Sequence, residues 1–411
     1  MNRSQADRLA PIARREPPVG EDGDGNGAAA GDSETGRTAP TRRQVLAGSV
    51  PALSALGGCL GLSAPTADGR TQLETFPTVP GSVNARLGFA GDAMLGRGVD
   101  ERWRDADDPA DIWGSLAGRL RTLDGFILNL ECCLSTRGER WPDKTYYFRA
   151  DPGWAVPALA AAGTTWVTLA NNHAVDFGPT ALRDTRQALS AAGIGHGGAG
   201  PDWTAALAPS VVSAGPLEVA LIGLSERWSE YRAGEDEPGT AYLPLDADRR
   251  ETRQTVRQLL GRAHEADPDL VVASLHWGPN WEAYPEPTHR EFGRWLVEQG
   301  VDLVHGHSAH VVQGVEIHRG RPILYDTGDV VDDYSVKPDL RNDRSFLFVL
   351  EIVDGRFEAV RLQPIEIDEY AVRPATAAAV SWLHDEMAAR CEPFDTPLQR
   401  DGDDLVIPLG E

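Results

Sequence analysis

Apolar runs that stop abruptly at polar residues are the feature of this sequence that most constrains its fold. Residues 166–170 (Trp-Val-Thr-Leu-Ala) are typical of a buried strand, and Asn171, Asn172 and His173 follow directly. Polar residues at the end of a buried strand often form the sites of α/β proteins. A capped helix start, with Asn172 or Asp176 accepting backbone N–H groups, explains this single ending equally well.

The same ending follows four further apolar runs. Asp92, Glu131, His276 and His307 each stand at or near the end of such a run, and His310 follows shortly after His307. Because the carboxyl ends of parallel strands meet at one edge of a sheet, these side chains can converge. Five such endings in sequence order predict one shared site rather than five separate helix caps.

Stretches with helical periodicity separate the apolar runs up to about residue 304, and this alternation predicts an α/β fold. Beyond that point the strands follow one another closely, as in hairpins or in a second sheet packed on the first. We expect strands at 87–90, 126–130, 166–170, 219–224, 270–275, 303–305, 312–317, 322–325, 346–352 and 357–362. We expect helices at 110–123, 155–162, 180–192, 249–265, 287–299 and 375–390.

The charge of the chain argues against two classes of partner. A formal net charge of −23 disfavours binding to nucleic acid and to anionic membrane surfaces. Lys144 and Lys337 are the only lysines among the 411 residues. Halophilic proteins use an acid-rich surface in this way, so we interpret the charge as an adaptation to salt.

The beginning of the chain predicts export and lipid anchoring. Residues 1–40 are polar and predict a disordered leader. Residues 41–59 contain twin arginines, a short apolar run and then Cys59, the order of a twin-arginine lipoprotein signal. Residues 60–84 are rich in proline, serine and threonine and predict a tether. The alternative is a hydrophobic stretch followed by a chance cysteine.

We therefore expect lipidation at Cys59 and localisation at the extracytoplasmic face of the cell membrane, with the lipid as the membrane contact. Residues 85–368 are expected to form the folded domain. Residues 369–411 are expected to form a C-terminal helix followed by an acidic tail.

The polar residues at the strand ends have the donor atoms of a divalent metal site. Carboxylate, amide and imidazole groups suit ions such as Mn, Fe, Zn or Mg, and paired ions can clamp a phosphoryl group. The expected ligands are Asp92, Glu131, Asn172, His276, His307 and His310. His173 is suited to protonate a leaving group, Arg97 to hold an anionic substrate, and Asp176 joins them as a predicted catalytic residue. For any single histidine the alternative is a structural role.

These segments resemble the CapA family of poly-gamma-glutamate capsule synthesis proteins, which is related to the calcineurin-like metallophosphoesterases. The resemblance runs from about residue 87 to residue 334 and ends near Gly328-Asp329. Its motifs are Phe-Ala-Gly-Asp-Ala-Met-Leu-Gly-Arg, Asn-Leu-Glu, Ala-Asn-Asn-His-Ala-Val-Asp-Phe-Gly, His-Trp-Gly and Gly-His-Ser-Ala-His. The resemblance implies a sandwich of two sheets flanked by helices, extracytoplasmic placement and a role in polyglutamate capsule assembly or export.

The sequence departs from the related enzymes in ways that bear on the number of metals. Met94 takes the place of the histidine in the classical Asp-x-His motif, and a thioether is a poor ligand for hard ions. Asn129 and Glu131 stand near the place of a Gly-Asp motif. Ser308 stands where the usual Gly-His-His-Pro-His form has its second histidine, and His305 is a candidate to compensate. Two metals, one metal or none remain open.

Three functions remain open, and the sequence does not decide whether the chain is an enzyme. The first is a capsule-biosynthesis protein with metal-dependent hydrolase activity on a phosphoester or on the anionic polyglutamate. The second is a non-catalytic scaffold that binds the polymer or a membrane capsule-synthesis complex, with Arg97, Arg149 and Arg290 as cationic contacts. The third is a general extracytoplasmic metallophosphatase.

Overall fold

The computed structural model describes residues 79–410. The expected leader, the signal with Cys59 and the tether up to residue 78 lie outside the described residues. At the end of the expected tether, Val79 is buried, and its N–H donates to the carbonyl oxygen of Gly355 at 2.7 Å. Within residues 79–410, no helix has the length and apolar character needed to cross a membrane.

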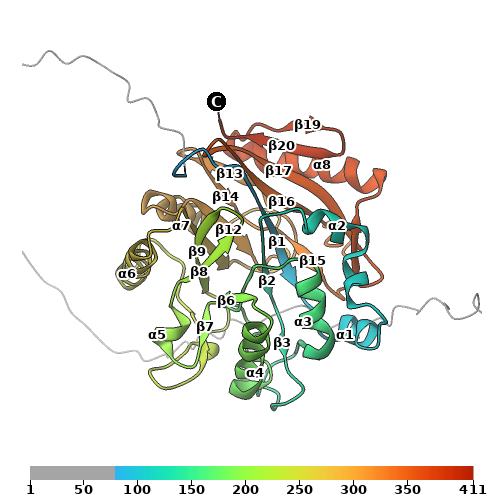
Figure 1. Cartoon of the computed structure of the whole chain (residues 1–411), viewed down its shortest axis with the longest axis vertical. Coiled ribbons are helices and arrows are strands. Elements are labelled where there is room, and N and C mark those ends of the chain that lie inside the picture. Colours follow the sequence, from blue (N-terminus) through green and yellow to red (C-terminus); the bar gives the residue numbers. More distant parts are fainter. Residues whose placement is uncertain (1–78, 411) are drawn as a thin grey trace, which may run out of the picture. The chain divides into compact units, whose positions relative to one another are not determined.

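Two large sheets form the centre of the domain (Figure 1). The ten-stranded sheet has the order β19 (Gln399–Asp401), β20 (Asp404–Pro408), β17 (Arg356–Asp368), β16 (Arg344–Val353), β1 (Ala85–Ala93), β2 (Gly125–Leu130), β5 (Trp166–Thr168) and β6 (Gly195–Gly197), with β15 (Asp329–Val331) beside β1 and β18 (Ala371–Pro374) beside β17. The strands β1, β2, β5, β6 and β15 run parallel.

The six-stranded sheet has the order β13 (Val315–His318), β14 (Arg321–Leu324), β12 (Leu303–His307), β11 (Leu270–His276), β9 (Leu217–Ser225) and β8 (Ser210–Ala214). Its four middle strands run parallel. Two small sheets pair β3 (Cys133–Leu134) with β4 (Arg149–Ala150) and β7 (Ala199–Gly200) with β10 (Gly239–Thr240).

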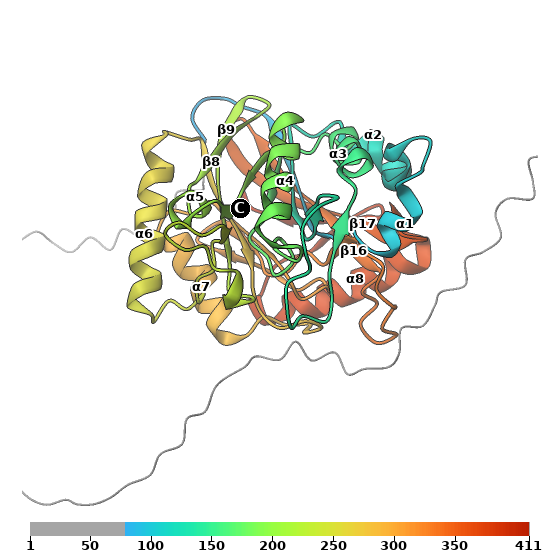
Figure 2. The same ribbon diagram turned by 90° about the horizontal axis from the view of Figure 1, so that it is seen from below.

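Helices cover the outer sides of both sheets (Figure 2). The helices packed with the ten-stranded sheet are α1 (Gly98–Trp103), η1 (Pro109–Leu116), α2 (Ala117–Leu120), α3 (Pro152–Ala161) and α4 (Gly178–Ala191). The helices packed with the six-stranded sheet are α5 (Trp203–Ala206), α6 (Arg250–Glu265) and α7 (Pro287–Glu298). Helix α8 (Ala377–Cys391) packs into the core between the sheets. The α/β sandwich of two sheets flanked by helices is therefore confirmed.

Alternation along the strands divides the apolar residues between these layers. On β11, Leu270 and Val272 belong to the core between the two sheets, whereas Val271, Ala273 and Leu275 belong to the core shared with α6 and α7. Successive side chains of a strand point to opposite faces, so a continuous apolar run serves both cores at once. Such a run is therefore apolar throughout, as expected for a strand that is buried on both faces.

The segment expected as one helix over 110–123 is shorter and interrupted. It forms η1 and α2, and Gly114 inside it adopts φ 48 and ψ −135. This backbone conformation favours glycine and does not continue a helix. The expectation of a single regular helix was wrong here, because one glycine outweighed the apolar periodicity.

The end of the chain differs from the expected helix and acidic tail. Helix α8 is present, but β20 also pairs with β17, with Ile407 opposite Val360. Leu405 and Ile407 are buried in the core between the sheets. The last strands therefore extend the ten-stranded sheet. Charged residues flank these strands in the sequence, so their alternating apolar positions do not stand out.

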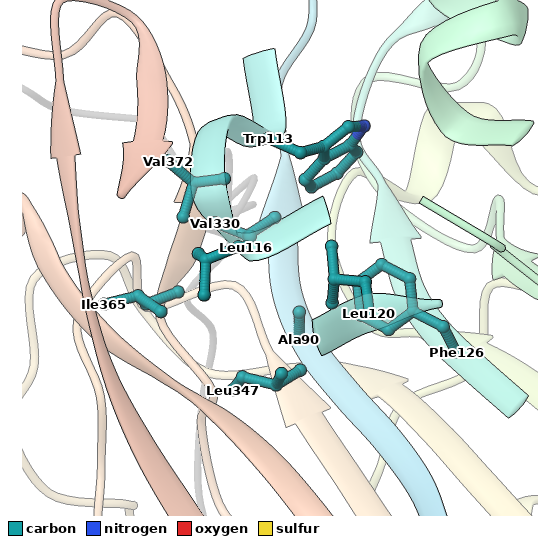
Figure 3. Close-up of a pocket in the computed structure, with 9 residues that line it drawn as sticks. All are labelled: Ala90, Trp113, Leu116, Leu120, Phe126, Val330, Leu347, Ile365 and Val372. Atoms are coloured by element: carbon teal, nitrogen blue, oxygen red, sulfur yellow. The ribbon is translucent and has the colours of Figure 1, made fainter. Parts of the chain in front are cut away.

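A small apolar cavity lies in the core between the ten-stranded sheet and its helices (Figure 3). The lining side chains are Ala90, Trp113, Leu116, Leu120, Phe126, Val330, Leu347, Ile365 and Val372. Cavities lined in this way stay dry, and none of these side chains offers an acid, a base or a metal ligand. We assign this cavity to core packing.

Candidate metal centre

The layer between the two sheets changes from apolar to polar toward the carboxyl ends of the parallel strands. On β2, Ile127 belongs to the inter-sheet core, and Asn129 and Glu131 follow it at steps of two residues. Because side chains two residues apart share a face, all three point toward the second sheet. Both polar residues are completely buried.

The six-stranded sheet changes in the same way. Val272 on β11 and Leu303 on β12 belong to the inter-sheet core, and His276 and His307 end these strands on the same faces. The polar ends meet, since Nδ2 of Asn129 lies 3.3 Å from Nδ1 of His276. We call the following buried residues the polar cluster: Asp92, Asn129, Glu131, Asn172, His276, His307, His310 and Asp329.

Asp92 enters the polar cluster because β1 changes register. Phe89 belongs to the inter-sheet core, whereas Ala90 and Met94 belong to the outer core. Strict alternation from Phe89 would turn Asp92 to the outer face, but the pairing with β2 shifts between these two residues. Bulges of this kind re-aim side chains near active sites. The irregularity brings the carboxylate between the sheets.

Hydrogen bonds join the members of the polar cluster across both sheets. Nδ2 of Asn129 donates to Oδ1 of Asp92 at 2.6 Å and to Oε2 of Glu131 at 3.2 Å. Nε2 of His276 lies 2.7 Å from Oδ1 of Asn172 and 3.5 Å from Oε1 of Glu131. Nδ1 of His276 lies 2.9 Å from Nδ1 of His307. All of these are residues that the motifs singled out.

The two strand-end histidines are electrostatically suited to bind a cation. Burial lowers the pKa of His276 well below its usual value and lowers the pKa of His307 to about 4. Both rings are therefore neutral near neutral pH and keep a nitrogen lone pair. Their ligand nitrogens and a carboxylate oxygen of Asp92 all lie within 4.8 Å of one another.

The carboxylates of the polar cluster lack a full set of partners. Burial and the charge of Asp92 raise the pKa of Glu131, while His310 helps to hold the pKa of Asp92 low despite its burial. Oε1 of Glu131 and Oδ2 of Asp329 are buried and make no hydrogen bond to any residue between 79 and 410. Uncompensated buried charges cost several kcal/mol. The donor set therefore fits a divalent cation.

A second network holds His173 beside the polar cluster. Nδ1 of His173 lies 2.7 Å from Oδ2 of Asp176, and its Nε2 lies 3.8 Å from Oε1 of Glu131. Nζ of Lys144 donates to Oδ1 of Asp176 at 2.6 Å, and the Lys144 side chain is only 2% exposed. The hydroxyl of Tyr231 donates to the same carboxylate at 3.0 Å. Because Asp176 accepts at Nδ1, the proton there is fixed and Nε2 faces the cluster.

Arg97 lies at the edge of this region. Its Nε forms an ion pair with Oδ2 of Asp333 at 3.1 Å, and its side chain is 30% exposed. The guanidinium lies 4.8 Å from the ring centre of Phe148, which contacts the His173 ring at 4.6 Å. Tyr334 contacts both Phe148 and the ring of His310. Arg97 is thus one aromatic ring away from His173.

The other two arginines considered for polymer binding pack against rings elsewhere. Arg149 lies 4.0 Å from the ring centre of Phe177, and Arg290 lies 4.8 Å from that of Phe394. Neither contact involves a member of the polar cluster. Arg97 is therefore the best placed of the three for a substrate at this site.

The loop after β12 has a strained backbone, and hydrogen bonds to two aspartates hold it in place. Ser308 and His310 have φ values of 113 and 58, which are uncommon for residues other than glycine. The N–H of Ser308 donates to Oδ2 of Asp92 at 3.2 Å, and that of Ala309 donates to Oδ2 of Asp326 at 2.7 Å. Such strain persists where the surroundings over-determine it, often at functional sites.

Sequence patterns do not predict the place of two residues of this site. Lys144 lies in a polar loop far from any apolar run, and nothing in the sequence marks it except the rarity of lysine. Asp329 stands out in the sequence only as part of the closing Gly-Asp motif. Its place beside Asp92 follows from the parallel pairing of β15 with β1.

Comparisons with known proteins agree with these motifs. Residues 86–334 match the family described as bacterial capsule synthesis protein PGA_cap. A probable polyglutamine synthesis accessory protein of Mycobacterium tuberculosis is 33% identical over 74% of this chain and 90% of its own length. The capsule biosynthesis protein CapA of Bacillus anthracis is 27% identical over 57% of each chain. The PGA biosynthesis protein CapA of Bacillus subtilis is 25% identical over 70% of this chain and 72% of its own.

Proposed function

Because the chain belongs to the bacterial capsule synthesis protein family, we propose that it acts in the assembly or export of a poly-γ-glutamate capsule as a metal-dependent hydrolase. The matched residues 86–334 include every member of the polar cluster. The substrate is an anionic one, either the glutamate polymer or a phosphoester.

One observation carries the catalytic part of this proposal, namely a buried set of neutral imidazoles beside carboxylates that lack a full set of hydrogen-bond partners. Asp92, Glu131, Asn172, His276 and His307 would hold a divalent ion such as Mn, Fe, Zn or Mg. A bound ion supplies Lewis-acid stabilisation of negative charge that develops on the substrate. The protein residues around it bind, orient and protonate.

His173 is the residue suited to move a proton. Asp176 fixes the proton at Nδ1, and His173 together with the buried ammonium of Lys144 keeps the pKa of Asp176 low despite its burial. Nε2 is then the atom that can pass a proton to a leaving group near Glu131. Lys144 acts on the substrate only through Asp176 and His173, as a positioning residue.

Arg97 is suited to recognise the anionic group of the substrate. Its Nη1 is buried and makes no hydrogen bond to the described residues, although its Nε is paired with Asp333. A carboxylate or phosphate oxygen at this position would satisfy the free donor. Since the chain carries a net charge of −23, a polyanion has to rely on such local cations.

We propose that the protein works at the extracytoplasmic face of the membrane, anchored through Cys59 after twin-arginine export, with the residues from 60 up to the buried Val79 as tether. The order of twin arginines, apolar run and cysteine supports this. A membrane capsule-synthesis complex is then the proposed partner. Cys59→Ser should move the protein from the membrane fraction to the soluble extracytoplasmic fraction. Unchanged membrane retention would contradict the anchor.

The activity is tested with the full-length chain loaded with Mn²⁺ and offered poly-γ-glutamate or a chromogenic phosphodiester. We expect hydrolysis that is lost in His173→Gln, with metal content retained, and unchanged in Arg290→Gln, a matched change outside the site. Hydrolysis of the phosphodiester alone would identify a phosphoester as the substrate class. Polymer binding without hydrolysis of either compound would support a scaffold and would overturn the proposed hydrolase.

A further inference from the structure

The pairing of β15 with β1 places two buried carboxylates side by side. Asp92 and Asp329 are register partners on these parallel strands and are 0% and 1% exposed. The strands come very close, since a Cβ on Gly91 would lie 1.6 Å from the carbonyl oxygen of Gly328. Neighbouring like charges in a sheet are destabilising, and burial increases this cost.

His310 joins the two carboxylates. Its Nδ1 lies 2.9 Å from Oδ1 of Asp329 and 3.2 Å from Oδ2 of Asp92. One imidazole nitrogen cannot satisfy both carboxylates, and Oδ2 of Asp329 makes no hydrogen bond within residues 79–410. Ligand atoms of these three residues all lie within 4.8 Å of one another. One imidazole and two carboxylates therefore offer three metal-ligand atoms around a single position.

The backbone on both sides of this group is fixed by one acid. Oδ1 of Asp326 accepts the N–H of Gly328, and Oδ2 accepts the N–H of Ala309, both at 2.7 Å. Asp326 thereby ties the start of β15 to the strained loop that carries His310. The relative positions of Asp329 and His310 are therefore held by the fold rather than by their mutual contact.

Asp92 belongs to both groups of donors. Its Oδ1 lies 3.7 Å from Nδ1 of His307, whereas its Oδ2 lies 3.2 Å from Nδ1 of His310. A carboxylate whose two oxygens face different donor groups can bridge two cations. Met94, in contrast, lies in the outer core on the far side of β1, so its thioether cannot take part.

We propose that Asp329, together with Asp92 and His310, forms a second cation position, in which Asp329 supplies the ligand that is absent at Met94. This inference rests on the proposed metal centre. The two positions differ in chemistry, because the first group combines two imidazoles with one carboxylate and the second combines one imidazole with two carboxylates. The second position therefore favours harder ions such as Mn²⁺ or Mg²⁺.

The test uses the full-length protein, stripped of metal and dialysed against Mn²⁺, with elemental analysis and electron paramagnetic resonance. Wild type should hold two Mn²⁺ per chain with the spectrum of a coupled pair. Asp329→Asn, which keeps the shape of the side chain, should hold one Mn²⁺ with an uncoupled six-line spectrum. Met94→Leu is the matched control and should keep the coupled pair.

The negative results distinguish the second cation position from the metal centre as a whole. A coupled pair in Asp329→Asn, or a single Mn²⁺ in saturated wild type, would overturn the second position and leave the first intact. Wild type without any bound Mn²⁺ would overturn the metal centre altogether. Circular dichroism checks folding, and if Asp329→Asn does not fold, His310→Gln replaces it with the same expected loss of one Mn²⁺ and of coupling.

Discussion

The two ends of the layer between the sheets are built on the same strands and have opposite chemistry. At one end Phe89, Leu270 and Phe348 belong to a core of apolar side chains. At the other end the polar cluster places carboxylates, amides and imidazoles in an equally buried space. The apolar end stabilises the sandwich, whereas the polar end costs free energy. The apolar end therefore supplies the stability that allows a strained, charged site to persist at the other end.

The largest expected effect is at the shared carboxylate of the polar end. Asp92→Asn removes the charge that both donor groups use, so bound metal should fall to less than about a tenth of the wild-type content. Folding should be retained, because the amide has the same shape and relieves repulsion with Glu131 and Asp329. Elemental analysis measures this, with Asp184→Asn near the surface as control. If Asp92→Asn kept its full metal content, the Asp92 carboxylate would not be a metal ligand, and the polar end would not be the metal centre.

A substitution at the apolar end provides the complementary test. Phe348→Ala deletes a fully buried ring and should lower the free energy of unfolding by about 3–5 kcal/mol. The protein that remains folded should still bind its metal, because Phe348 contributes no ligand. Urea unfolding followed by elemental analysis of the folded fraction gives both quantities. A loss of metal without a loss of stability would show that the two ends are not separable.

Removal of metal is the next largest effect. A chelator should lower the free energy of unfolding of wild type by about 2.7 kcal/mol if the free metal before chelation was about 100 times its dissociation constant. Asp92→Asn should show no such change, since it starts without metal. Thermal unfolding with and without chelator measures the difference. Equal midpoints for wild type in both conditions would argue against a metal at the polar end.

The smallest effect concerns a histidine outside the polar cluster. Burial lowers the pKa of His196 on β6, so the unfolded chain takes up its proton first as the pH falls. Stability should therefore be fully present above about pH 6.5 and decline below it, with a slope well under the one-proton limit of about 1.4 kcal/mol per pH unit. His196→Gln should flatten this decline without changing metal content. A steeper decline in the variant would show that folding does not lower the pKa of His196.

Local sequence patterns predict most of the fold but only part of the site. The apolar run of β11 predicted its strand nearly to the residue, and the polar ending at His276 marked the edge where the sheets meet. The strands β19 and β20 were missed because their pairing with β17 depends on distant residues. The bulge that turns Asp92 inward, and the register that sets Asp329 beside Asp92, are likewise long-range effects. Periodicity along one segment cannot reveal them.

Crystals of the Mn²⁺-loaded protein, measured at the manganese absorption edge, test most directly whether the polar end is a metal centre. We predict two anomalous peaks, each at coordination distance, about 2.0–2.3 Å, from its donors. One peak should contact Asp92, His276 and His307, and the other should contact Asp92, His310 and Asp329. A well-ordered, Mn²⁺-saturated crystal without an anomalous peak in the polar cluster would contradict a metal centre at the polar end.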